Sequence, residues 1–161
     1  MIRPATAQDA QAIATLYNHY IQTTCITFEE EPVTAQIIQE RMNDVAAQEL
    51  PWIVAEYEGT LVGYAYAAKF HKRTAYRFAA ETTVYLNPQF KGKGFGKLLY
   101  EVIIKSLREK NYNVVIGSIA LPNANSVGLH ESLGFKKAGH FSQIGFKFNQ
   151  WIDVGYWQLS L

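Results

Sequence analysis

Cysteine is nearly missing from this sequence of 161 residues, and so is any long apolar run. The one cysteine, Cys25, makes no disulfide within the chain, so nothing indicates an oxidising compartment. No activating pattern surrounds Cys25, and we interpret it as a half-buried structural thiol rather than a nucleophile. Residues 1–5 lack the apolar region of a signal peptide, and no stretch approaches a membrane span in length. We therefore expect a cytoplasmic protein that does not enter a membrane.

The sequence also lacks an excess of charge of either sign. Its 15 Lys and Arg residues face 14 Asp and Glu residues, which leaves a net charge of +1. Such a balance gives no support to nucleic-acid binding, and we expect none. The histidines are scattered without ligand spacing, so we expect no metal; they are His19, His71, His130 and His140.

Apolar residues, in contrast, make up 48% of the chain, and aromatic residues make up 14%. This composition and length predict one domain over residues 1–161 with a core of its own. Periodicity predicts the element order β-α-α-β-β-β-α-β-α-β-β, an α/β arrangement with a mixed sheet. Strands are expected at 2–4, 51–57, 61–67, 80–86 and 113–119 and in the tail 135–161. Helices are expected at about 10–20, 32–47, 96–110 and 126–133.

Two helices rest on specific signals. Pro32 is expected to open the second helix, because proline is favoured at the first helical position. The third helix is the clearest in the sequence, since its apolar residues recur at helical spacing. These apolar positions are Leu98, Leu99, Val102, Ile103 and Leu107.

The strongest single signal is a glycine-rich loop between a strand and the third helix, Lys91-Gly92-Lys93-Gly94-Phe95-Gly96-Lys97. Glycines let the backbone approach an anion closely, and a helix start presents free N–H groups with the positive end of the dipole. The lysines add charge, so the loop predicts a phosphate cradle. Its spacing fits neither a P-loop nor a dinucleotide-binding fingerprint. On the loop alone, a flexible solvated turn stays open.

Several motifs together resemble the GCN5-related N-acetyltransferases. The loop Lys91-x-x-Gly94-x-Gly96 is similar to their coenzyme A motif, Arg/Gln-x-x-Gly-x-Gly/Ala, with Lys in the first place. Three later segments are also similar to elements of that family. They are Asn123-Ala124-Asn125-Ser126, Leu129-His130-Glu131 and Leu133-Gly134-Phe135.

The resemblance narrows to the phosphinothricin (methionine sulfoximine) acetyltransferases. It runs from about Arg73 to the C-terminus, and the motifs that carry it follow one another in the same order. They are Ala80-Glu81-Thr82-Thr83-Val84-Tyr85, Leu121-Pro122-Asn123, Leu129-His130-Glu131, Gly145-Phe146-Lys147 and Trp151-x-Asp153-Val154-Gly155. The resemblance implies a central mixed, mostly antiparallel sheet flanked by helices. It also implies acetyl-CoA as co-substrate, a small amino-acid-like amine as acceptor, and a homodimer.

Two catalytic residues follow from the resemblance. Glu81 is the candidate base that removes a proton from the acceptor ammonium, directly or through a water. Its alternative role is that of an exposed carboxylate in a salt bridge with Arg73 or Arg77. His130 is the candidate acid for the leaving thiolate, at a position where many members of the wider family carry Tyr. Its alternative role is that of a structural histidine hydrogen-bonded in the helix packing.

The resemblance also implies the binding residues. Coenzyme A contacts are expected from Val84, Tyr85, Leu86, Lys91, Gly92, Lys93, Gly94, Phe95, Gly96, Lys97 and Asn123. The strand residues would pair with the pantetheine arm through their backbone. Substrate contacts are expected from Phe28, Arg73, Thr74, Ala75, Tyr76, Glu81 and Thr83. Arg73 would grip the acceptor carboxylate through two hydrogen bonds, although a loop arginine is often only a solvated charge.

Other functions stay open on the sequence. The acceptor could be a peptide N-terminus, a polyamine or an antibiotic amine, although the basic loop with Lys72, Arg73 and Arg77 disfavours a polyamine. A non-catalytic acyl-CoA-binding module is a further alternative. The aromatic tail fits a dimer interface or a core equally well; its members include Phe146, Phe148, Trp151, Tyr156 and Trp157.

Overall fold

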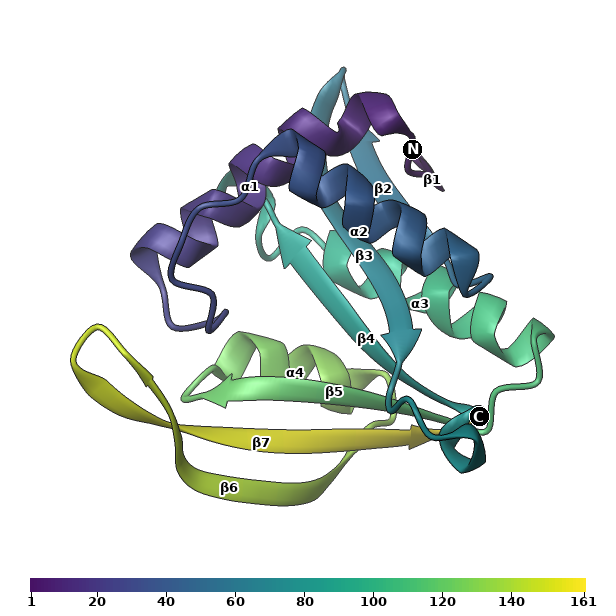
Figure 1. Cartoon of the computed structure of the whole chain (residues 1–161), viewed down its shortest axis with the longest axis vertical. Coiled ribbons are helices and arrows are strands. Elements are labelled where there is room, and N and C mark those ends of the chain that lie inside the picture. Colours follow the sequence, from purple (N-terminus) through teal and green to yellow (C-terminus); the bar gives the residue numbers. More distant parts are fainter.

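Seven strands form one sheet in the order β1-β2-β3-β4-β5-β7-β6, in a computed structural model that describes residues 1–161 (Figure 1). All neighbouring strands are antiparallel except β4 and β5, which are parallel. The strands are β1 (Ile2–Pro4), β2 (Trp52–Tyr57), β3 (Thr60–Lys69), β4 (Ala79–Leu86), β5 (Val114–Leu121), β6 (Lys136–Lys147) and β7 (Gln150–Ser160). The helices are α1 (Ala10–Thr23), α2 (Ala35–Ala47), α3 (Phe95–Glu109) and α4 (Ala124–Ser132). The predicted element order and the mixed, mostly antiparallel sheet are confirmed.

The sheet splits between its two parallel strands, and this split positions the site. β4 pairs with β5 only where Ala79–Glu81 faces Val114–Ile116. Beyond Glu81 the two strands diverge, as Figure 1 shows, so residues 82–86 have no strand partner on that side. Helices α1 and α2 pack on one face of β2 and β3, α3 covers the opposite face, and α4 lies against β5.

The buried stripe of α3 differs from the expected one. Leu99, Ile103 and Leu107 are fully buried, as predicted, whereas Leu98 and Val102 are 48% and 40% exposed. The 3.6-residue turn places 98 and 102 at the edge of the stripe, because Tyr100 and Ile104 complete its buried side.

Helix α2 begins at Ala35, and the prediction that Pro32 opens it is wrong. The side chain of Thr34 accepts a hydrogen bond from the backbone N–H of Ile37 at 3.2 Å and so caps the helix. The helix therefore begins three residues after the predicted start. Pro32 instead belongs to the irregular segment that connects α1 to α2. Part of that segment, Ile26–Phe28, lines a cavity.

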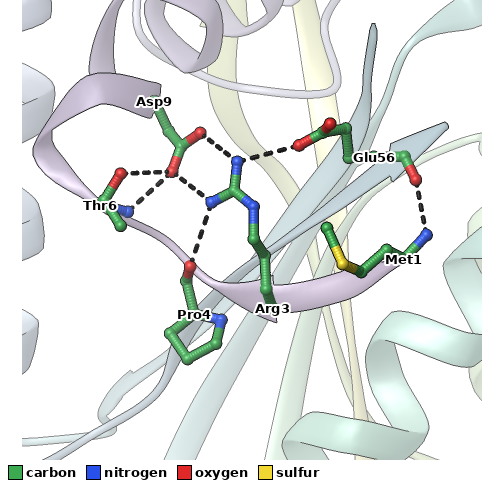
Figure 2. Close-up of polar contacts among 6 residues, drawn as sticks. All are labelled: Met1, Arg3, Pro4, Thr6, Asp9 and Glu56. Carbon is green, nitrogen blue, oxygen red and sulfur yellow. Dashed lines mark hydrogen bonds and ion pairs between the residues drawn. The ribbon is translucent and has the colours of Figure 1, made fainter. Parts of the chain in front are cut away.

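A network of charged side chains fixes the N-terminal strand (Figure 2). The guanidinium group of Arg3 lies 2.8 Å from the carboxylate of Asp9 and 3.0 Å from that of Glu56 on β2. Asp9 also accepts a hydrogen bond from the backbone N–H of Thr6 at 2.7 Å. The hydrogen bonds from Arg3 lower the pKa of Asp9 to about 2. The network thus ties the start of α1 to the sheet edge.

The C-terminal hairpin of β6 and β7 reaches beyond β5 and α4 (Figure 1). Its register shifts between Lys137 and Gly139 and again between Phe141 and Gly145. Several large apolar side chains of this hairpin are more than half exposed. They are Phe141, Ile144, Phe146, Phe148 and Trp151. None of the four α-helices combines the length and apolar character needed to span a bilayer.

Candidate active site

Two cavities of about 420 Å³ and 690 Å³ meet in the split between β4 and β5. Ile26, Val84, Tyr85, Asn123 and Ser126 line both of them. The larger cavity extends along the start of α3, and the smaller one extends along β4 and β5 toward the β6–β7 hairpin. The shared wall means that groups bound in the two cavities would face each other.

The start of α3 forms one end of the larger cavity. Gly92 and Gly94 have φ angles of +74° and +85°, and an added Cβ at either would meet nothing within 4 Å. Gly94 precedes the helix, and no side chain caps its first turn. The N–H groups of that turn are therefore free to bind an acceptor. Lys91 and Lys97 line the same cavity.

This arrangement fits an anionic diphosphate. Two other helices have side-chain caps at their starts: Thr34 caps α2, and Asn123 caps α4. At α3 the open backbone, the positive end of the helix dipole and two lysines are all exposed to one cavity. The glycine loop thus has the geometry of a cradle rather than that of a disordered turn.

Most of the predicted coenzyme A residues line the larger cavity. They are Val84, Tyr85, Leu86, Lys91, Gly92, Gly94, Gly96, Lys97 and Asn123. Two predicted residues do not line it: the ammonium group of Lys93 lies over the ring of Phe90 at 5.1 Å, and the Phe95 ring packs against Tyr57 and Phe90. Asn123 also has a structural role, because its side-chain oxygen accepts from the N–H of Ser126 at 3.1 Å.

The open edge of β4 supplies backbone groups to the cavities. Tyr85 packs its ring among Tyr17, Tyr20 and Tyr64, with centroid distances of 5.1, 5.1 and 5.6 Å. The hydroxyl of Tyr20 donates to the carbonyl oxygen of Leu86 at 2.5 Å. These aromatic contacts hold the strand, while its edge toward β5 stays unpaired.

Glu81 lies on the wall of the smaller cavity, at the point where β4 and β5 part. Burial raises the pKa of its carboxyl group, and a hydrogen bond with Ser118 on β5 partly offsets this rise. Glu81 makes no ion pair with Arg73 or Arg77. Arg77 instead lies over the Phe78 ring at 4.6 Å. The expected salt-bridge alternative for Glu81 is therefore absent from the structure.

His130 is 2% exposed and has hydrogen bonds at both ring nitrogens. Nδ1 lies 2.7 Å from the carbonyl oxygen of Ser126, and Nε2 lies 3.0 Å from the Tyr100 hydroxyl. A carbonyl oxygen only accepts, so Nδ1 carries the proton, and Nε2 of the neutral ring accepts from Tyr100, whose hydroxyl also lies 3.4 Å from the carbonyl oxygen of Thr82. Burial lowers the pKa of His130. An added Cβ at Gly117 would overlap the imidazole, so this position has room only for glycine.

The predicted substrate residues fall into two groups. Phe28, Glu81 and Thr83 line the smaller cavity. Arg73, Thr74, Ala75 and Tyr76 lie in and around the short 3-10 turn Thr74–Tyr76 before β4, outside the residues that line either cavity. In the single chain these loop residues are exposed. The structure therefore brings Phe28 to Glu81's cavity and does not bring Arg73 to it.

Some residues of the site were not predicted from the sequence. Tyr100 lines the smaller cavity. Its position could have been noticed in the sequence, because a tyrosine among the buried residues of α3 needs a partner for its hydroxyl. Ser118 could have been found only by pairing β5 with β4 in register. Ser126 belongs to the motif Asn123-Ala124-Asn125-Ser126, but the sequence predicted no role for it. Thr27, in an irregular segment, carried no signal at all.

Residues 2–155 match the family model described as an acetyltransferase (GNAT) domain. The chain is 41% identical over 159 residues to a phosphinothricin N-acetyltransferase of Streptomyces viridochromogenes, covering 98% of this chain and 85% of that protein. It is 32% identical over 163 residues to an L-methionine sulfoximine/L-methionine sulfone acetyltransferase of Salmonella typhimurium, covering 99% and 94%. The crystal structure of a Sinorhizobium meliloti phosphinothricin acetyltransferase with AcCoA superposes with a TM-score of 0.97 at 33% identity, covering 100% and 88%.

Proposed function

The chain belongs to the GNAT acetyltransferase family, and we propose that its acceptor is the α-amine of a small amino-acid analogue such as phosphinothricin or methionine sulfoximine. The protein is an acetyl-CoA-dependent N-acetyltransferase. The names of its relatives support the class of acceptor. The observation that carries the proposal is Glu81, half-buried and unpaired with any cation, on the wall of a 420 Å³ cavity that adjoins the glycine cradle.

The larger cavity is the proposed acetyl-CoA site. The backbone N–H groups after Gly94 and the ammonium groups of Lys91 and Lys97 would bind the diphosphate. The unpaired edge of β4 at Val84–Leu86 would bind the amide groups of the pantetheine arm, and the side-chain NH₂ of Asn123 would add a donor. When bound, acetyl-CoA supplies the acetyl group as an activated thioester.

Glu81 is proposed to remove the proton from the acceptor ammonium, directly or through a water. An alkylammonium is not nucleophilic until it loses that proton. Because burial raises the pKa of Glu81, the carboxylate binds a proton more tightly than an exposed one would. Ser118 on β5 lines the same cavity and partly offsets this rise in pKa.

His130 and Tyr100 are proposed to supply the proton that the leaving thiolate needs. Tyr100 lines the cavity, and His130 is hydrogen-bonded to the Tyr100 hydroxyl. A protonated His130 would pass its Nε2 proton to the Tyr100 oxygen while Tyr100 gives its own proton to the thiolate. The hydrogen bonds of His130 equally support the alternative in which it only orients Tyr100.

Arg73 stays the proposed partner of the acceptor carboxylate. Its loop leads directly into β4 and therefore to Glu81. The side chain would reach the cavity when the loop closes or when a second chain packs beside it. We include a cytoplasmic homodimer in the proposal. The exposed apolar hairpin supports a dimer, because Ile144 is 60% exposed and also lines the smaller cavity, so an interface here would adjoin the site.

A thiol-release assay with acetyl-CoA and a panel of amines tests the proposal. The panel contains phosphinothricin, methionine sulfoximine, a polyamine, an aminoglycoside antibiotic and a peptide with a free N-terminus. Turnover is expected to be fastest with the two amino-acid analogues. Faster turnover with any other member assigns a different acceptor, and no turnover with any amine favours a non-catalytic acyl-CoA-binding module.

A further inference from the structure

Lys147, near the end of β6, is a buried lysine without a carboxylate partner. Its side chain is 2% exposed, and its one hydrogen bond goes from Nζ to the carbonyl oxygen of Thr27 at 2.9 Å. The ammonium group also lies over the ring of Phe148 at 5.1 Å. Burying an ammonium without a counter-ion is costly, and burial lowers the pKa of Lys147. The hydrogen bond to the Thr27 carbonyl oxygen is the contact that offsets part of this cost.

Thr27 belongs to the irregular segment of residues 24–34 that connects α1 to α2. Figure 1 shows this segment descending from α1 toward the tip of the β6–β7 hairpin. Its residues Ile26, Thr27 and Phe28 line the smaller cavity. The segment is therefore part of the wall against which an acceptor would bind.

On its N-terminal side the segment is held by α1 and α2. The hydroxyl of Tyr17 lies 2.8 Å from that of Thr27, and Tyr17 also donates to Glu29. The carboxylate of Glu29 pairs with both terminal guanidinium nitrogens of Arg41, at 2.6 and 2.9 Å. These contacts fix the segment to the helices but not to the C-terminal half of the sheet, which forms the opposite side of the cavity.

The strand β6 and its turn provide the attachment to that half. Gly145 lies two residues before Lys147 and so on the same face of the strand. An added Cβ at Gly145 would overlap the ring of Phe28, which shows that the ring rests directly on the backbone of β6. A weaker contact joins Gln150 to Cys25, with Nε2 at 3.4 Å from Sγ. Lys147 supplies the one charged contact of this attachment.

We propose that Lys147 is a positioning residue for the acceptor amine, holding the Thr27 carbonyl so that the Phe28 wall is fixed across the smaller cavity. The inference rests on the proposed function, because it takes this cavity as the acceptor site. Without the ammonium group, only the Phe28 packing and the weak Gln150–Cys25 contact join the segment to the β6–β7 hairpin, and the acceptor binds in more orientations. The cradle at α3 does not depend on this contact. Lys147 therefore acts on acceptor binding more than on acetyl-CoA binding.

Lys147→Met tests this, with Lys136→Met, an exposed lysine of the same strand, as the matched control. Lys147→Met is expected to raise KM for methionine sulfoximine by about tenfold or more, the effect of losing one charge-assisted hydrogen bond. KM for acetyl-CoA is expected to stay within about twofold, and Lys136→Met to match wild type. Lys147→Arg keeps a charged donor and is expected to recover most of the loss. An unchanged acceptor KM, or an equal rise in both KM values, overturns the inference.

A double-mutant cycle with Phe28→Ala separates positioning from a general loss of structure. Once the Phe28 ring is gone, Lys147→Met is expected to change the acceptor KM by less than about threefold. Fully additive effects would overturn the inference. If Lys147→Met does not fold, Gly145→Ala displaces the same ring and is expected to give the same split between the two KM values.

The wild-type measurement keeps the two proposals distinguishable. Wild-type protein that ignores amino-acid analogues contradicts the proposed function, and the Lys147 comparison is then made with the best amine of the panel. Wild-type protein that accepts them while Lys147→Met behaves like wild type contradicts only the positioning role.

Discussion

The hydroxyl of Tyr100 lies 3.0 Å from Nε2 of His130, and both side chains are almost completely buried on the wall of the smaller cavity. Because Nδ1 of His130 faces the carbonyl oxygen of Ser126, the phenolic proton is the one shared between the two rings. This pair connects the short helix α4 to α3, and both residues line the smaller cavity, where we propose that Tyr100 protonates the leaving thiolate. Its removal should therefore affect both stability and turnover.

Tyr100→Phe leaves Nε2 of a buried imidazole without a partner. We expect kcat to fall by about tenfold or more and the free energy of unfolding to fall by about 1–3 kcal/mol. Steady-state kinetics and urea denaturation measure the two effects. Tyr112→Phe, a tyrosine whose hydroxyl has no partner within the chain, is the control. A normal kcat in folded Tyr100→Phe would limit the pair to a structural role.

Glu81→Gln should separate activity from stability. The rate of acetylation at neutral pH is expected to fall by about 10²-fold, the usual contribution of a general base. Burial raises the folded-state pKa of Glu81 above its ordinary value of 4.5, so wild type loses stability as pH rises through the folded pKa. The variant cannot ionise, and its melting temperature is expected to exceed that of wild type at pH 8 but not at pH 4. Near-normal turnover in the folded variant would remove Glu81 from the mechanism.

His130 should make the protein sensitive to mild acid. Burial lowers its folded-state pKa below the ordinary 6.5, so the unfolded chain binds the proton more readily than the folded chain. Stability is then present above pH 6.5 and is lost as pH falls below it. Melting temperatures between pH 8 and pH 5 are expected to fall less in His130→Gln than in wild type. His19→Gln, at an exposed site on α1, should follow wild type, and identical slopes for all three proteins would refute the account.

The pH dependence of turnover tests the proposed proton transfer from His130 through Tyr100 to the thiolate. If a protonated His130 feeds Tyr100, the alkaline side of the kcat profile is expected to disappear in His130→Phe. The ascending limb that Glu81 causes should stay. A profile of unchanged shape would leave His130 only the task of orienting Tyr100.

Gly94 offers a controlled test of the cradle. Gly94→Ala places a side chain at φ +85°, and Gly59→Ala does the same at φ +74° in the turn between β2 and β3. Both variants are expected to lose about 1–2 kcal/mol of stability from the left-handed conformation. Only Gly94→Ala is expected to weaken acetyl-CoA binding, by about tenfold or more, as measured by calorimetry. Equal affinities in the two variants would contradict a cradle at α3.

The element order, the place of the glycine loop and the place of Glu81 on its strand could be predicted from the sequence, because they depend on local signals. Helical spacing and strand runs predicted where α3 and β4 lie, and the glycines predicted a loop before α3 whose backbone an anion can approach closely. Contacts between distant segments carried no such signal. Lys147 meets Thr27 across 120 residues, and nothing in either local pattern indicates the partner. The hydrogen bond of Ser118 to Glu81 likewise depends on the register of two parallel strands.

The loop that contains Arg73 lies in a place that the local sequence pattern does not predict. The resemblance implies Arg73 at the acceptor site, and its loop leads directly into the strand that carries Glu81. In the single chain a turn and an extended stretch carry Arg73 away from the cavity. A carboxylate clamp at Arg73 therefore needs loop closure or a second chain, neither of which a local pattern encodes.

An amino-acid acceptor is tested by comparing methionine sulfoximine with its carboxamide and with a simple alkylamine, using wild type and Arg73→Ala. Methionine sulfoximine, the free acid, is expected to have the highest kcat/KM of the three amines in wild type. Arg73→Ala is expected to cost the free acid about 2–4 kcal/mol of transition-state binding, while Arg73→Lys raises its KM more than it changes acetyl-CoA binding. The carboxamide and the alkylamine should be little affected by either change. Equal kcat/KM for all three amines in wild type would show that no carboxylate is recognised and would contradict an amino-acid acceptor.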